Sequence, residues 1–123
     1  DHRVRASGPR VRLPPGAALT LALVLHELAT NAVKYGALSN DTGCVEVTWT
    51  LPGEDRMVLT WTESGGPPVA APTRRGFGSR LIERSLRNEL GGSASMSYDP
   101  EGFRCTLEAK IPPSDDLGLF DWD

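Results

Sequence analysis

Three polar side chains recur on one side of a segment that otherwise has the composition of a buried helix. Glu27, Asn31 and Lys34 lie in HELATNAVKYGALS, residues 26–39, which directly continues the apolar run ALTLALVL. At about 100° per residue, spacings of four and three place these side chains together on one helix face, on the edge opposite the apolar side. A carboxylate, an amide and an ammonium group in a row suit a ligand that combines phosphate with a metal ion.

Each of these groups has a chemistry of its own. Asn31 offers an uncharged oxygen, which is a hard ligand for Mg²⁺. Glu27 could act as a base toward a hydroxyl, an imidazole or a water, and Lys34 could neutralise phosphate oxygens as a point charge. The helix alone leaves two alternatives open: a solvated face with a Glu–Lys pair, and a structural role for His26 at the border of the apolar side.

A second motif combines an acid with glycines at the end of a predicted strand, in WTESGGP, residues 61–67. The Glu63 carboxylate could accept a hydrogen bond from the exocyclic amine of adenine. Gly65 and Gly66 would let the backbone pass close to the base without a side-chain clash. The alternative is an exposed turn after an edge strand.

A third motif, RGFGSRL, residues 75–81, leads from a loop into a predicted helix. Gly76 and Gly78 would leave backbone amides accessible, and the helix N-terminus behind them favours anions. Ser79 could cap that helix. The motif is neither a Walker motif nor a dinucleotide fingerprint.

Hydrophobic periodicity predicts the elements that must position these motifs. The first helix should bury a side formed by Leu21, Val24, Leu25, Leu28, Ala32 and Tyr35. The full set of expected elements is a short hairpin or two edge strands over 3–13, a helix over 16–35, strands over 44–51 and 56–63, a helix over 79–90, and strands over 93–98 and 103–111. This order predicts an α/β two-layer sandwich with a mostly antiparallel sheet.

Composition narrows the class of protein. The chain has 123 residues and a formal net charge of −3, which gives no reason to expect a nucleic-acid partner. The longest apolar run, 17–25, is too short to span a membrane and contains Thr20. Cys44 and Cys105 match no metal spacing and are expected to be reduced thiols. We expect a domain over 1–112 and a loose acidic tail over 113–123, cut from a longer protein because the chain lacks an initial methionine.

The three motifs together resemble a known family. HELATNAVKYGALS resembles the N box of the histidine kinase ATP-binding domain, in the gyrase, Hsp90, histidine kinase and MutL superfamily. WTESGGPPV resembles its first glycine box and RRGFGSRLIERSL its second. His26, Trp61 and Glu63 fit the signature of the HWE family of histidine kinases. The resemblance covers roughly Leu13 to Pro112.

The resemblance implies a Bergerat-type fold that binds ATP with Mg²⁺. Asn31 would coordinate the metal, Glu27 matches the position proposed as general base, and the N-box His26 joins it as a candidate catalytic residue. Trp61 would pack in the core. Toward adenine, the implied contacts are Glu63 with the exocyclic amine, Gly65 and Gly66 against the base, and Thr106 as a hydroxyl supporting recognition. Toward the phosphates, they are Lys34, Tyr35 near the ribose or phosphates, and Gly76, Phe77, Gly78 and Ser79. Residues 70–75 would form an ATP lid.

The implied activity is transfer of the γ-phosphoryl group to a histidine on a separate helical dimerisation domain, then to an aspartate of a response regulator. We expect this segment not to include that helical domain, and His2 is not expected to be the acceptor. The domain would be cytoplasmic, without membrane contact. The alternatives are a serine kinase or ATPase of the same superfamily, and a docking module without activity.

Overall fold

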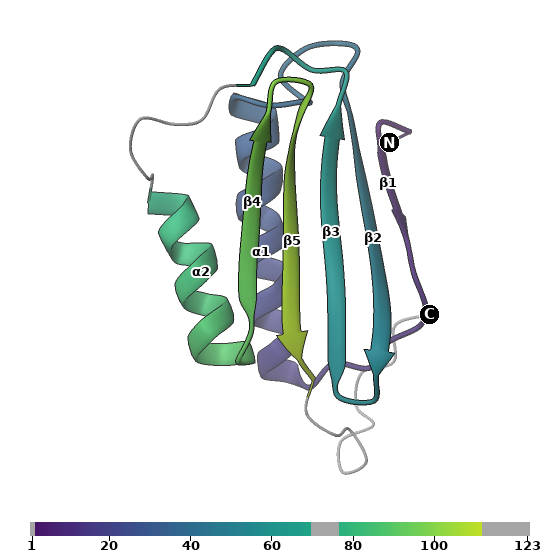
Figure 1. Ribbon diagram of the computed structural model, residues 1–123, viewed down its shortest axis with the longest axis vertical. Coiled ribbons are helices and arrows are strands. Elements are labelled where there is room, and N and C mark those ends of the chain that lie inside the picture. The colour runs from purple at the N-terminus through teal and green to yellow at the C-terminus, as the bar shows by residue number, and fades with distance from the viewer. Residues whose placement is uncertain (1, 70–76, 112–123) are drawn as a thin grey trace.

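Two helices cover one face of a five-stranded sheet in the computed structural model of the protein, which describes residues 2–69 and 77–111 (Figure 1). The sheet order is β1-β2-β3-β5-β4; β1 runs parallel to β2 and all other pairs are antiparallel. The elements are β1 Val4–Ser7, α1 Pro15–Lys34, β2 Cys44–Gly53, β3 Arg56–Ser64, α2 Phe77–Leu90, β4 Ser93–Asp99 and β5 Gly102–Lys110. The predicted two-layer sandwich is confirmed.

Helix α1 begins where the sequence predicts and packs on the sheet. Pro15 occupies its first turn, where a missing N–H breaks no hydrogen bond. Its buried stripe is Ala17, Thr20, Leu21, Val24, Leu28 and Ala32. By length and composition α1 could cross a membrane, with 20 residues and a mean hydropathy of 1.4, and a core helix can meet the same criterion.

Tyr35 does not belong to this buried stripe, contrary to the expectation from its spacing. The helix ends at Lys34, and Tyr35 takes non-helical angles of φ −130° and ψ −19°. Its side chain is 74% exposed. Because the helix ends one residue before Tyr35, helical spacing no longer sets the direction of its side chain, and the phenol ring points to solvent.

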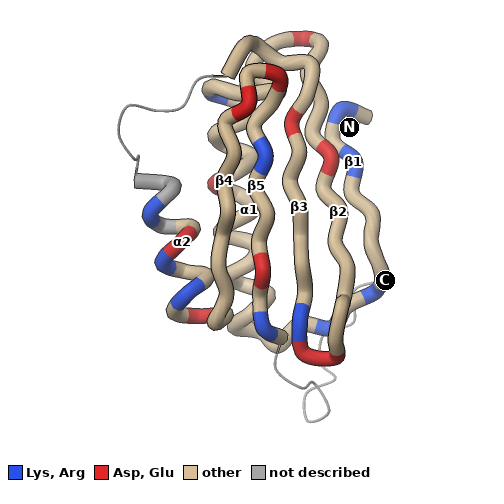
Figure 2. Tube along the Cα trace, in the orientation of Figure 1, with Lys and Arg blue, Asp and Glu red and all other residues tan. Residues whose placement is uncertain are grey.

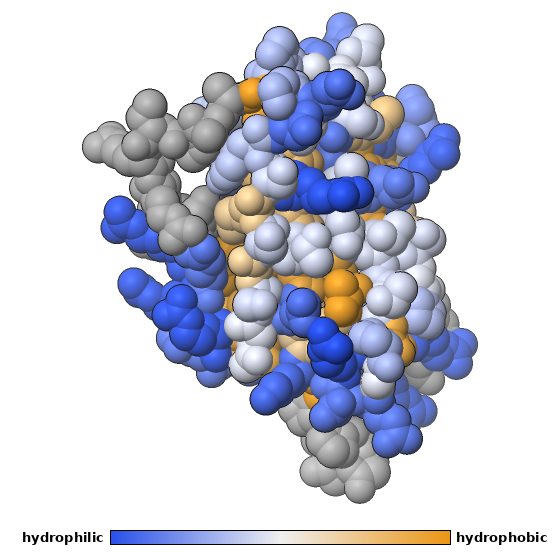
Figure 3. Space-filling view, viewed as in Figure 1, coloured by the Kyte–Doolittle hydropathy of each residue, from blue (hydrophilic) through white to orange (hydrophobic). Residues whose placement is uncertain are grey.

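Strand alternation divides the sheet into a core face and an open face. Val47, Trp61 and Cys105 are aligned across β2, β3 and β5, and all three are buried beneath the helices. Along each strand, the alternate residues point to the open face of the sheet. Most of these are serines and threonines, namely Thr48, Thr50, Thr60, Thr62, Thr106, Ser93, Ser95 and Ser97. Figure 3 looks onto this open face, where pale and blue residues predominate and orange, hydrophobic residues form smaller areas between them.

The expected hairpin over residues 3–13 is wrong. Only β1 forms there, and it joins the sheet edge in parallel with β2. Beyond it, the chain folds over Trp49, whose Nε1–H donates to the Pro9 carbonyl oxygen at 2.7 Å. A Cβ on Gly8 would lie 2.4 Å from the indole ring, so the glycine permits this close packing where a turn was expected.

The buried stripe of α1 gives a stability prediction. Leu28 is 1% exposed whereas Leu23, on the same helix, is 54% exposed. We expect Leu28→Ala to lower the free energy of unfolding by about 2–5 kcal/mol, because it removes apolar contacts and leaves a cavity. Leu23→Ala should change it by less than about 0.5 kcal/mol. Equal effects in chemical denaturation would contradict the packing of α1.

The two thiols should differ in reactivity. Burial raises the pKa of the Cys105 thiol to about 12, whereas Cys44 is exposed. Because the thiolate is the reactive form, native protein at pH 8 should react with a thiol reagent at one site, and unfolded protein at two. Cys44→Ser should abolish the native reaction. Rapid modification of both thiols in the folded protein would contradict this.

Candidate functional site

A buried carboxylate lies at the end of β3, next to the end of α1. Glu63 is only 5% exposed. Its Oε1 accepts a hydrogen bond from the backbone N–H of Ala37 at 2.9 Å, and its Oε2 accepts one from the indole N–H of Trp61 at 2.8 Å. Burial of a carboxylate is costly unless donors replace its water. These two donors therefore fix Glu63 at the junction of α1 and the sheet.

The strand period explains why a tryptophan and a glutamate meet here. Trp61 and Glu63 are two residues apart in β3, so both side chains point toward the helix layer. Their partners on β2 are Val47 and Val45, which are also buried. Trp61 is 4% exposed and belongs to the core, as expected from the sequence.

Glycines let the segment after α1 approach β3 and the chain beyond it. A Cβ on Gly36 would lie 2.2 Å from Glu63 Oε1, and one on Gly66 would lie 2.5 Å from the Ala37 Cα. Gly65 has a φ of +73°, which disfavours other residues. These glycines thus allow close contact between two parts of the chain, a role that the motif alone does not indicate, and the predicted contact of Gly65 and Gly66 with adenine stays a prediction.

Arg3 holds the same segment from the side of β1. Its Nε donates to the Gly43 carbonyl oxygen at 2.8 Å, and its terminal nitrogen donates to those of Ala37 and Asn40. Sequence reasoning missed Arg3, because no local pattern marks a contact between residues about forty positions apart.

Two side chains of this segment also reach the first glycine motif. Thr42 Oγ1 donates to the Gly65 carbonyl oxygen at 2.9 Å, and Asn40 Nδ2 donates to the same atom at 3.4 Å. Residues 36–43 are therefore tied to β1 on one side and to the chain after β3 on the other. The Ala37 amide that faces Glu63 is held in place by this framework.

The polar stripe of α1 leads toward this junction. Glu27 and Asn31 are half-buried and Lys34 is exposed, which puts the stripe at the border of the packed face and not opposite to it. Within the described ranges, these three side chains make no hydrogen bond or ion pair. Asn31 lies about one turn before Gly36, which contacts Glu63. The described part of the chain contains no cluster of three or more His, Cys, Asp or Glu residues, so Asn31 would need ligand oxygens to complete a metal site.

Two other predicted site residues, His26 and Thr106, point away from this arrangement. His26 is exposed, and at about 100° per residue its side chain lies roughly 140° around α1 from Asn31. Tyr35 directly follows α1 and is exposed like Lys34, and its contact near the ribose or phosphates stays a prediction. Thr106 pairs with Thr60 on the open face of the sheet, so its side chain points away from the face that carries Glu63. The sequence pattern alone did not reveal on which face Thr106 would lie.

The second glycine motif is described only in part. Gly76 and the expected lid over 70–75 lie outside the described residues, as does the expected tail over 113–123. Helix α2 begins at Phe77, two residues earlier than predicted, so Gly78 and Ser79 lie within its first turn. Ser79 therefore is not the residue before the helix, as a capping role would require. Backbone amides of this first turn have no partner within the helix and can bind anions.

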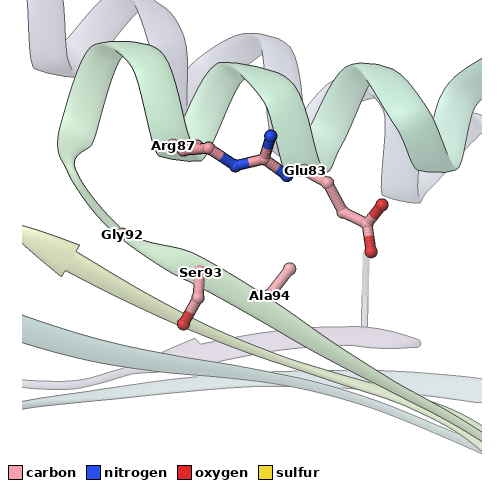
Figure 4. A pocket seen from close by; sticks show the side chains of 5 residues that line it. All are labelled: Glu83, Arg87, Gly92, Ser93 and Ala94. Carbon is pink, nitrogen blue, oxygen red and sulfur yellow. The ribbon is translucent and has the colours of Figure 1, made fainter.

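A small hollow lies elsewhere, between α2 and the start of β4 (Figure 4). It measures about 210 Å³ and is lined by Glu83, Arg87, Gly92, Ser93 and Ala94. Its residues belong to the later part of α2 and the following turn. The hollow therefore shares no residue with the junction at Glu63. Figure 2 shows charged residues of both signs along α2, the helix that lines it.

Curated relatives align with most of this chain. It is 46% identical over 104 residues to a blue-light-activated histidine kinase of Brucella anthropi, covering 82% of this chain and 21% of that protein. It is 40% identical over 115 residues to the protein of that name from Brucella ovis, covering 91% of this chain and 24% of that protein. The chain thus spans about a fifth to a quarter of these relatives' length. No family model matches it.

Solved structures share the fold at low sequence identity. The histidine kinase domain of the blue-light-activated kinase EL346 from Erythrobacter litoralis has a TM-score of 0.72 at 18% identity, covering 86% of this chain and 53% of that one. The catalytic domain of the histidine kinase ThkA has a TM-score of 0.65 at 17% identity, covering 88% of this chain and 78% of that one. These structures show that the chain has the fold of a histidine kinase catalytic domain.

The motif set that resembles the HWE family lies on the elements that meet at this junction. His26 lies in the N-box helix α1, and Trp61 and Glu63 form a hydrogen-bonded pair on β3. Over the segment that carries these motifs, the chain is similar to the blue-light-activated histidine kinases of Brucella.

The buried carboxylate gives a prediction about stability. In Glu63→Gln, one amide N–H₂ must face either the Ala37 N–H or the Trp61 N–H, so two donors oppose each other. We expect the free energy of unfolding to fall by about 1–3 kcal/mol. Glu46→Gln, at an exposed position of β2, should have almost no effect. Equal unfolding midpoints for the two variants would contradict the described hydrogen bonds.

Proposed function

We propose that this chain binds ATP with Mg²⁺ and is the catalytic part of a two-component histidine kinase. The observation that carries the proposal is the junction itself. A buried, hydrogen-bonded carboxylate stands at one end, and a row of side chains without partners among the described residues continues from it along α1. Such a junction offers an acceptor for a base and polar groups for a phosphate chain.

Glu63 would recognise the adenine base. A carboxylate has about four lone-pair positions, and the Ala37 and Trp61 N–H groups use two of them. The remaining positions can accept the exocyclic amine of adenine. Because Thr106 lies on the opposite face of the sheet, we leave it out of this contact.

The stripe on α1 would hold the phosphates. Bound Mg-ATP would supply the transferable phosphoryl group and the metal charge that stabilises its leaving oxygens. Asn31 would offer its amide oxygen to the metal, and Lys34 would neutralise phosphate oxygens. The amides in the first turn of α2 would contribute further donors. The residues present therefore fit the cofactor.

Glu27 would orient the acceptor. It lies one turn before Asn31 on the same face, where it can accept a proton from an incoming imidazole. His26 points to another side of α1, so we give it no part in this step. Most of the rate enhancement would come from positioning and charge neutralisation.

The phosphorylated histidine would lie on a helical dimerisation domain outside this segment. A response regulator would then receive the phosphoryl group, and ThkA has been solved in complex with the response regulator TrrA. Since the reaction consumes ATP, we place the domain in the cytoplasm.

Asn31→Ala tests the metal and phosphate end of the site. We expect the Mg²⁺-dependent affinity for a fluorescent ATP analogue to fall at least about tenfold, because a metal ligand is removed. Asn88→Ala is the matched control, an exposed asparagine near the end of α2. Unchanged Mg²⁺-dependent affinity in Asn31→Ala, with folding intact by circular dichroism, would remove the central assignment.

A further inference from the structure

We propose that Trp61 is a positioning residue for nucleotide recognition. Its indole N–H holds the Glu63 carboxylate in the orientation that accepts the 6-amino group of adenine, and thereby sets the preference for adenine over 6-oxo purines. This inference rests on the proposed ATP-binding function and assigns a base-selecting device within that site.

The geometry restricts Glu63 at both oxygens. Trp61 holds Oε2 from within β3, and the Ala37 amide holds Oε1 from the segment after α1. No buried side-chain nitrogen or oxygen in the described residues lacks a hydrogen-bond partner. Loss of the indole N–H would therefore leave Oε2 as a buried acceptor without a donor.

The need for such a restraint follows from the side chain. A glutamate has several rotatable bonds, and fixing them opposes binding unless contacts fix them beforehand. Gly36 has no Cβ, which would lie 2.2 Å from Oε1, so the carboxylate can reach the Ala37 N–H, but that bond fixes only one of its two oxygens. The hydrogen bond from Trp61 fixes the other oxygen, Oε2, and so sets the orientation of the carboxylate before any ligand arrives.

Selection among bases follows from the acceptor-only character of a carboxylate. An amino group at position 6 of the purine donates to Glu63, whereas an oxo group there would set two acceptors against each other. Discrimination is strong only while the carboxylate is held still, because a mobile carboxylate can turn away from the oxo group. ATP and inosine triphosphate therefore form the diagnostic pair of ligands.

Trp49 provides a matched control. It lies on the neighbouring strand β2, is half-buried, and its indole N–H also donates a hydrogen bond, to the Pro9 carbonyl oxygen at 2.7 Å. Its partner on β3 is Leu59, two residues before Trp61. Trp49→Phe thus removes a similar ring and donor without touching Glu63.

The experiment measures the binding of Mg-ATP and Mg-inosine triphosphate by calorimetry in wild type, Trp61→Phe and Trp49→Phe. We expect Trp61→Phe to weaken ATP binding about tenfold and to reduce the ATP preference by a similar factor. Trp49→Phe should leave the preference unchanged. An unaltered preference in folded Trp61→Phe would overturn the inference, whereas absence of ATP binding in wild type would overturn the proposed function itself.

A coupling measurement separates positioning from general destabilisation. In a Glu63→Ala background, Trp61→Phe should cause no further loss of ATP affinity, because the carboxylate on which it acts is gone. Full additivity of the two substitutions would contradict a role through Glu63.

A measurement on wild type applies even if Trp61→Phe fails to fold. The indole N–H signal of Trp61 in ¹⁵N-resolved NMR spectra should shift strongly with Mg-ATP and weakly with Mg-inosine triphosphate. The Trp49 signal should shift with neither. Equal responses of the Trp61 signal to both nucleotides would overturn the inference.

Discussion

The hydrogen-bonded carboxylate of Glu63 is the interaction on which the arrangement of this domain depends. A negative charge at 5% exposure must be compensated by donors, and the two donors come from different parts of the chain. One is the indole of the same strand, and the other is an amide just beyond α1. The charge therefore fixes the end of the first helix to the end of β3.

The surrounding backbone is built to bring these parts together. Gly36 and Gly66 permit approaches that a Cβ would prevent, and Arg3 fixes the intervening segment through three carbonyl groups. Contacts within the protein thus offset the conformational entropy that is lost when residues 36–43 become ordered. In the proposed function, a ligand at Glu63 would meet a site that is already formed, and less conformational entropy would be lost on binding.

Three sides of helix α1 lie in different environments. Its apolar stripe packs on the sheet, a polar stripe with Glu27 and Asn31 follows the border of that contact, and a third side with Leu19, Leu23 and Val33 is exposed. The half-buried border suits a binding stripe because polar groups there are oriented by neighbouring packing while they stay accessible. The candidate site thus lies at the edge of the hydrophobic core, where the packing of α1 on the sheet positions its polar side chains.

Periodicity in the sequence determined most of the elements. The alternation over residues 44–51 and 56–63 and the helical spacing around Leu28 specified β2, β3 and α1 to within a few residues, because burial of one face enforces those periods. The motif set also directed attention to Glu63, which the structure buries at the end of β3, and to the α1 stripe that contains Asn31. The pairing of β1 could not be predicted from the sequence, because its parallel partner β2 lies about forty residues away and nothing local indicates that pairing.

The sequence by itself determined which residue types could bind a nucleotide and the elements that carry them. Only the tertiary structure decided which of them meet. It joined Trp61 to Glu63, brought Ala37 and Arg3 into the junction, and turned Thr106 to the far face of the sheet. The physical reason is that local periods fix the direction of a side chain relative to its own element, whereas contacts between elements depend on register and packing across the whole sheet.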